Sequence, residues 1–200
     1  MSLVRSLLVS AAGLLAAAAA AQVTYRDPAA WDRAQLERRR AVVRVLTGWG
    51  AANVAAGTVV GLSADTECWR QFGWMSAGWG AVNAALGGFG LRAVRRDLAD
   101  SDRDFTQAHA EHQRLRRVLL FNAGLDVAYV AGGFYLRERA NRSGNADAER
   151  DRGWGLAVIA QGAALFAFDL LAERHLAGAR IDVRPVGAAD AVGLSTRVTF

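Results

Sequence analysis

Seven polar side chains interrupt otherwise apolar stretches of this chain, and their types could do chemistry. Asp126 stands at the middle of one stretch, and a carboxylate at the centre of a membrane span is costly and marks a candidate functional site. Asn122 and Tyr129 lie four residues before it and three after it, which predicts one shared helix face. The candidate intramembrane polar cluster comprises Asp126, Asn122, Tyr129, Asn53, Asn83, Gln161 and Asp169.

Two interpretations of this cluster remain open. One is a proton- or ion-coupled site centred on Asp126, as in a small transporter. The other is an interhelical hydrogen-bond network that fixes packing, with Asp126 protonated. We favour the network, because polar contacts inside membranes commonly serve helix association. Small residues at Gly124, Ala128 and Gly132 form a ridge that also suits close helix packing.

Other kinds of chemistry lack the residues they need. All 24 basic residues are Arg, so no Schiff-base or phosphate-loop lysine exists. The single Cys68 excludes an internal disulfide and a thiolate zinc site. His109 and His112 flank Glu111, but no further metal ligand accompanies them, which favours a solvated helix face. We therefore expect no metal, no cofactor and no enzymatic activity.

Four apolar runs must position the polar cluster: residues 45–62, 72–91, 118–136 and 153–172. Each has the length that crosses a hydrocarbon core as a helix, and none contains Arg, Lys or Glu. A water-soluble bundle would show a polar face within each run, and these runs show none. The sequence predicts an all-α fold, a transmembrane four-helix bundle over residues 45–174.

The flanking segments have different characters. Residues 1–21 resemble a secretory signal peptide, with Arg5 before an apolar run and three Ala before Gln22, although an uncleaved membrane helix is the alternative. Residues 22–44 form an Arg-rich amphipathic lead-in. We expect residues 92–117 to be a partly helical connector lying on the membrane surface. The tail, residues 175–200, alternates as strands do and predicts a short β-hairpin.

Two of the runs are internal copies. The segment Gly48–Gly57 aligns with Gly78–Gly87, and seven of the ten positions are identical, including a Gly-Trp-Gly opening. The repeat indicates either a duplication or two helices that meet the same packing demand.

The charge distribution predicts two opposite orientations. The net charge is +5, but the Arg residues occupy connections and alternate with acids, unlike a nucleic-acid-binding stripe. Of the Arg after the signal, 17 fall on one predicted side of the membrane and 6 on the other. The positive-inside rule places the richer side in the cytoplasm, whereas a cleaved signal peptide places it outside. The orientation is left open.

Several motifs resemble an uncharacterised family. They are Phe121–Tyr129 followed by Gly132-Gly133, Gly78-Trp79 with Val82-Asn83, and Gln161-Gly162 with Phe168-Asp169. The chain resembles, over roughly residues 35–175, small bacterial four-helix membrane proteins that are common in Bacteroidetes and grouped as a domain of unknown function. The resemblance implies a leader followed by four spans, without an assigned activity.

Together these observations predict an integral membrane protein that acts as a structural or partner-binding bundle. The partners we expect are the lipid bilayer and, within it, a second copy of the chain or another membrane protein, with no nucleic acid. The predicted location is a bacterial membrane, the inner (cytoplasmic) one.

Overall fold

The computed structural model describes residues 27–178, 180–188 and 191–199, with side chains up to residue 178. The described chain forms four long helices: α2 (Pro28–Ser63), α3 (Glu67–Ala99), α4 (Phe105–Ala140) and α5 (Ala148–Ala177). The chain divides into two units, residues 1–31 and 32–200, and the first is described only where α2 begins. The predicted signal peptide, residues 1–21, lies outside the described residues.

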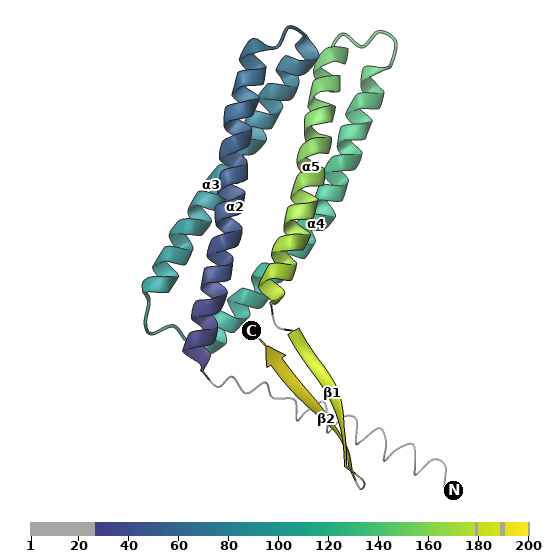
Figure 1. Cartoon of the computed structure of the whole chain (residues 1–200). Helices are drawn as coiled ribbons and strands as arrows, with labels where there is room; N and C mark the ends of the chain where they lie inside the picture. Colours follow the sequence, from purple (N-terminus) through teal and green to yellow (C-terminus); the bar gives the residue numbers. More distant parts are fainter. Residues whose placement is uncertain (1–26, 179, 189–190, 200) are drawn as a thin grey trace, which may run out of the picture. The chain divides into compact units, whose positions relative to one another are not determined.

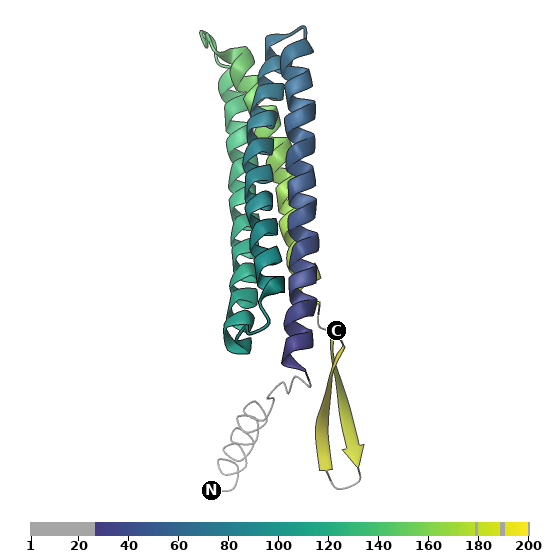
Figure 2. The same ribbon diagram turned by 90° about the vertical axis from the view of Figure 1, so that its left-hand side faces the viewer.

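Within the second unit, consecutive helices run in opposite directions and lie alongside one another (Figures 1 and 2). Short links of a few residues make this arrangement necessary, because they cannot carry the chain back to the other end of a helix. The structure therefore confirms a bundle of four helices.

Local polar residues set the helix starts. Pro28 opens α2, a position where its missing N–H is not needed. The Thr66 hydroxyl accepts a hydrogen bond from the Trp69 N–H at 3.4 Å ahead of α3. An Asp104 carboxylate oxygen accepts one from the Gln107 N–H at 2.8 Å ahead of α4. These side chains satisfy N–H groups that the first helical turn leaves unpaired.

The helices extend well beyond the predicted apolar runs. Residues 92–117 are largely helical, as expected, but they do not form a separate surface connector, since α3 continues to Ala99 and α4 already begins at Phe105. Residues 28–44 of the lead-in likewise belong to α2. Both segments lack internal proline and glycine and are rich in helix-forming Arg, Ala and Leu, so the helix propagates. Hydropathy shows where the side chains of a helix become polar. It does not show where the helix ends.

Three of the four helices, α2, α4 and α5, are long and apolar enough to cross a membrane. The fourth predicted span, residues 72–91, lies within α3, which does not reach the same hydropathy among the described helices. Glycine, Ser76 and Asn83 lower its average. By length and composition the structure thus supports three spans directly.

The internal repeat packs against itself. Gly50 of α2 and Gly80 of α3 occupy equivalent repeat positions, and each contacts the other's backbone. A Cβ added at either residue would lie 2.7 Å from the carbonyl oxygen of the other. The two antiparallel copies are therefore in backbone contact at one matched glycine pair.

A similar seam joins α4 to α5. Gly133 and Gly155 face each other, and a Cβ at either would lie 2.7 Å from the other's carbonyl oxygen. At the end of the bundle where α3 begins, Gly153 of α5 packs against the backbone of Cys68 and Phe72 in α3. Small residues allow helix backbones to approach closely, which is the dominant packing device inside membranes.

A small apolar core lies near the start of α4. Val42, Leu119, Ala172 and Leu176 are buried there, with Leu115 and Phe168 packed against them. After α5, β1 (Arg180–Ala188) and β2 (Ala191–Thr199) pair antiparallel, with Arg180 opposite Thr199 and Ala188 opposite Ala191.

Candidate functional site

The bundle has polar residues inside and large apolar residues outside. Ser76, Asn83, Asp126, Gln161 and Asp169 are all buried. In contrast, bulky apolar side chains point outward along every helix, including Leu62, Phe89, Phe121 and Leu171, of which Phe89 is 73 % exposed. So many exposed large apolar side chains along all four helices form a surface that water-soluble proteins rarely show.

Gln161 of α5 connects to two polar side chains of α2. The Trp49 indole N–H donates to Gln161 Oε1 at 3.3 Å, and Gln161 Nε2 donates to Asn53 Oδ1 at 2.6 Å. Asn53 Nδ2 in turn donates to the Trp49 carbonyl oxygen at 2.9 Å. The Gln161 network, defined as Trp49, Asn53 and Gln161, therefore holds α2 to α5 by direct hydrogen bonds.

Asp126 of α4 and Asp169 of α5 form the second part of the predicted cluster. Their side chains lie within hydrogen-bonding reach of each other, and the residues are only 3 % and 6 % exposed. Two carboxyl groups can form such a bond only if one of them carries a proton. We call these two residues the carboxyl pair. It places two buried acids side by side between α4 and α5.

Within the four apolar runs, three buried polar atoms have no hydrogen-bond partner among the described residues. They are the second carboxyl oxygen of Asp126, the Asn83 amide nitrogen and the Ser76 hydroxyl. Buried polar groups in proteins are normally paired, so unpaired ones indicate positions suited to a bound water or a transferable proton.

The predicted cluster is thus brought together only in part. Asn53 with Gln161, and Asp126 with Asp169, are in contact across helices. Asn122 is half-buried. Tyr129 is 39 % exposed and packs edge-on against Trp79 at 5.0 Å, beside a groove of about 510 Å³. All three residues lie on α4, but they do not form one buried polar cluster. Spacing of three and four residues covers a wide arc, and Asp126 alone of the three is buried.

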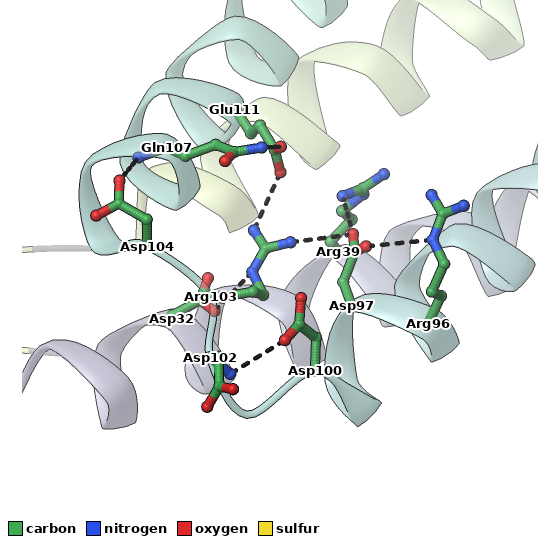
Figure 3. Close-up of polar contacts among 10 residues, drawn as sticks. All are labelled: Asp32, Arg39, Arg96, Asp97, Asp100, Asp102, Arg103, Asp104, Gln107 and Glu111. Atoms are coloured by element: carbon green, nitrogen blue, oxygen red, sulfur yellow. Dashed lines mark hydrogen bonds and ion pairs between the residues drawn. The ribbon is translucent and has the colours of Figure 1, made fainter.

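A charged cluster that the sequence analysis missed lies at the end of the bundle where α3 and α4 meet (Figure 3). Arg103, in the link between them, is its centre. Its guanidinium group reaches Asp32 at 3.0 Å, Glu111 at 3.0 Å and Asp97 at 3.5 Å. Arg39 also contacts Asp97 at 3.2 Å. We define the Arg103 cluster as these five residues.

The Arg103 cluster ties α2, α3 and α4 together beside a cavity of about 380 Å³. Burial alone would lower the pKa of Arg103, but its hydrogen bond to Glu111 and the charges of Asp32 and Asp97 raise that pKa, so the guanidinium stays charged. Sequence reasoning took these charges for solvated connector residues. The signal that could have identified them is the dense mixture of acids and Arg between residues 97 and 104.

A second charged contact lies at the opposite end of the bundle. Asp151 is fully buried and accepts two hydrogen bonds from Arg139, at 2.5 and 2.6 Å, and one from Asn145 at 3.0 Å. Nearby, the Trp154 indole N–H donates to Gln71 Oε1 at 2.9 Å, which joins α5 to α3. Polar side chains therefore fasten both ends of the bundle. Within residues 27–178, His, Cys, Asp and Glu form no group of three able to hold a metal ion.

Fold and site together define a class of protein: a four-helix bundle with glycine seams, a polar interior and an apolar exterior. Residues 45–170 match a family described as a family of unknown function, DUF6992, and the chain belongs to that family. The match begins later and ends earlier than the predicted range of residues 35–175. No curated protein and no solved structure matches the chain.

Proposed function

We propose that the chain is an integral membrane protein that crosses the membrane with four helices, α3 included. The observation that carries this proposal is the outward display of large apolar side chains around buried polar ones. In water such a surface is costly, at roughly 25 cal/mol for each Å² of apolar area left exposed. In a bilayer the same surface is favourable, because lipid chains cover it.

The packing of α3 supports its inclusion among the spans. It is joined to α2 through Gly50 and Gly80, and to α5 through Gly153. It also exposes Leu86 and Phe89 on its outer side. A helix that is attached to two spanning neighbours along its length reaches the same membrane depth as they do, even though its own hydropathy is lower.

The role that fits this bundle best is structural or partner-binding. The Gln161 network and the glycine seams use polar and small side chains to fix helices against one another, which favours a rigid scaffold. We expect no catalysis, since Cys68 lies near the start of α3 while His109 and His112 lie at the opposite end of the bundle. Following the family resemblance and the helical spans, we place the protein in the inner membrane of a bacterium.

Extraction of the full-length chain from membranes tests the membrane location. We expect the protein to stay in the membrane pellet in alkaline carbonate and to be released only by detergent. Recovery of the folded chain in the carbonate supernatant would contradict the proposal, because it would mean that the apolar exterior is covered by something other than lipid.

A second candidate function, proton handling, is favoured by the carboxyl pair. Asp126 and Asp169 are two buried acids that can share a proton between α4 and α5, and Asp126 has an oxygen without a described partner. In this function the pair would take up and release that proton as the bundle opens to one side.

Proteoliposomes with an imposed pH gradient separate the two functions. If the protein handles protons, the Asp126→Asn variant loses proton flux. The Asp65→Asn variant, which changes an exposed acid in the link between α2 and α3, retains it. Equal flux in wild-type and Asp126→Asn proteoliposomes would eliminate proton handling and leave the structural role.

A further inference from the structure

A basic pocket lies where α2 begins and α5 ends, at one end of the bundle. Its volume is about 420 Å³. Arg38 of α2 contributes one wall, and the last turns of α5 contribute the others. The lining residues, which define the Arg38 pocket, are Arg38, Leu171, Arg174, His175 and Gly178.

The Arg38 guanidinium group has an unused donor in this pocket. Its Nη1 atom is enclosed by protein but has no hydrogen-bond partner among the described residues. It lies directly against the backbone of Gly178, so close that any Cβ at that position would overlap it. An enclosed charged donor without an acceptor is unfavourable, and a bound acceptor would satisfy it.

The charge around the pocket favours an anion. Arg174 and His175 are exposed and form no ion pair within the described part of the chain. The adjacent acid on α5, Glu173, is already paired with Arg116 at 2.6 Å. Glu37, beside Arg38 on α2, contacts Arg40 at 3.4 Å. The pocket therefore combines two guanidinium groups and an imidazole, with no unpaired acid beside them among the described side chains.

The depth of the pocket indicates which anion it takes. Arg38 precedes the apolar run 45–62, and Arg174 follows the run 153–172, so the pocket lies at the membrane surface. Leu171, 67 % exposed, gives it an apolar wall on the membrane side. Basic pockets between helices at this depth bind anionic lipid headgroups.

We propose that the Arg38 pocket binds the phosphate group of an anionic phospholipid, whose acyl chains lie against Leu171. This inference rests on the membrane location proposed above. The phosphate oxygens accept hydrogen bonds from Arg38 Nη1 and from the guanidinium of Arg174, and a planar guanidinium suits a phosphate in both shape and charge.

Thermal unfolding of the full chain in a zwitterionic detergent tests the site. The protein is titrated separately with phosphatidylglycerol, phosphatidylcholine and inorganic phosphate. We expect phosphatidylglycerol alone to raise the Tm of the wild type. The double variant Arg38→Gln/Arg174→Gln should bind it about 30-fold more weakly, given the usual contribution of each basic residue near an anionic surface. The control Arg95→Gln/Arg117→Gln removes the same charge from two exposed positions and should respond as the wild type does.

Three results would overturn the inference. Equal lipid responses of the pocket variant and the control would mean that the effect is general electrostatics. A Tm increase produced fully by inorganic phosphate would assign the pocket to a free anion. If the double variant does not fold, Arg174→Gln, an exposed position, must show the weakened lipid response, and a wild-type response would contradict the site. Release of the chain into the carbonate supernatant would refute the proposed membrane location. A phosphate response that depends on Arg38 would, even then, identify the pocket as an anion site.

Discussion

Asp126 and Asp169 are the two carboxyl residues within the apolar runs, and both are buried. They lie on different helices, and both are buried where α4 packs against α5. Sequence reasoning identified both as candidate residues, because an acid inside an apolar run is rare whatever the fold. It could not pair them, since the pairing depends on how α4 and α5 are rotated about their axes.

Asp151 provides a pH-dependence prediction at the residue scale. It precedes the apolar run 153–172, and the hydrogen bonds from Arg139, assisted by that from Asn145, lower its pKa to about 2. In the unfolded chain its pKa returns to the usual range near 4. The resulting stabilisation is complete above about pH 4 and is lost as the pH falls toward 2.

Melting in detergent between pH 6 and pH 2 checks this expectation. The Tm of the wild type should fall more steeply below pH 4 than that of Asp151→Asn, which has no carboxylate to protonate at this position. Asp65→Asn, at an exposed acid, should follow the wild type. Parallel curves for the wild type and Asp151→Asn would show that Asp151 is not the group responsible.

At the scale of helices, the glycine seams decide which surfaces meet. Gly50 and Gly80 bring the two repeat copies into backbone contact, while Gly48 and Gly78, which open the same Gly-Trp-Gly motifs, have no neighbouring atom within 4 Å of an added Cβ. Each motif thus contains one packing glycine and one free glycine. The chain therefore offers matched test and control positions two residues apart.

Alanine substitutions at these four positions test the seam. Gly50→Ala and Gly80→Ala should each destabilise the bundle by about 1–3 kcal/mol, because the new methyl group forces the backbones apart. Gly48→Ala and Gly78→Ala should be neutral, or stabilise the helix by up to about 1 kcal/mol. The measurement is reversible unfolding in mixed micelles. Equal effects at seam and control positions would mean that α2 and α3 do not meet at this pair.

The sequence predicted the presence of the four helices better than it predicted their first and last residues. Apolar length located all four helices, because each contains one of the four runs. It misplaced their ends by many residues at the Arg-rich boundaries, since helix propensity and proline, and not hydropathy, determine where a helix stops. The Arg103 cluster was missed for a related reason. Its members lie far apart in the chain, and only the fold brings Asp32 beside Arg103.

For the bundle as a whole, we propose that the apolar exterior faces lipid and that α3 spans the membrane with its neighbours. The difference in charge between the two ends of the bundle then predicts its orientation in the membrane. The end that holds the α3–α4 link carries most of the Arg, which the positive-inside rule places in the cytoplasm. A cleaved signal peptide would place the same end outside. One labelling experiment distinguishes these orientations and also tests the number of spans.

That measurement is the reactivity of single cysteines with a membrane-impermeant maleimide, in sealed vesicles of known sidedness before and after permeabilisation. In a Cys68→Ser background, cysteines replace the exposed link residues Asp65, Ser101 and Ser143, one at a time. We predict that Asp65→Cys and Ser143→Cys react from one side and Ser101→Cys from the other. Reaction of Asp65→Cys and Ser101→Cys from the same side would contradict the claim, because it would mean that α3 does not cross the membrane.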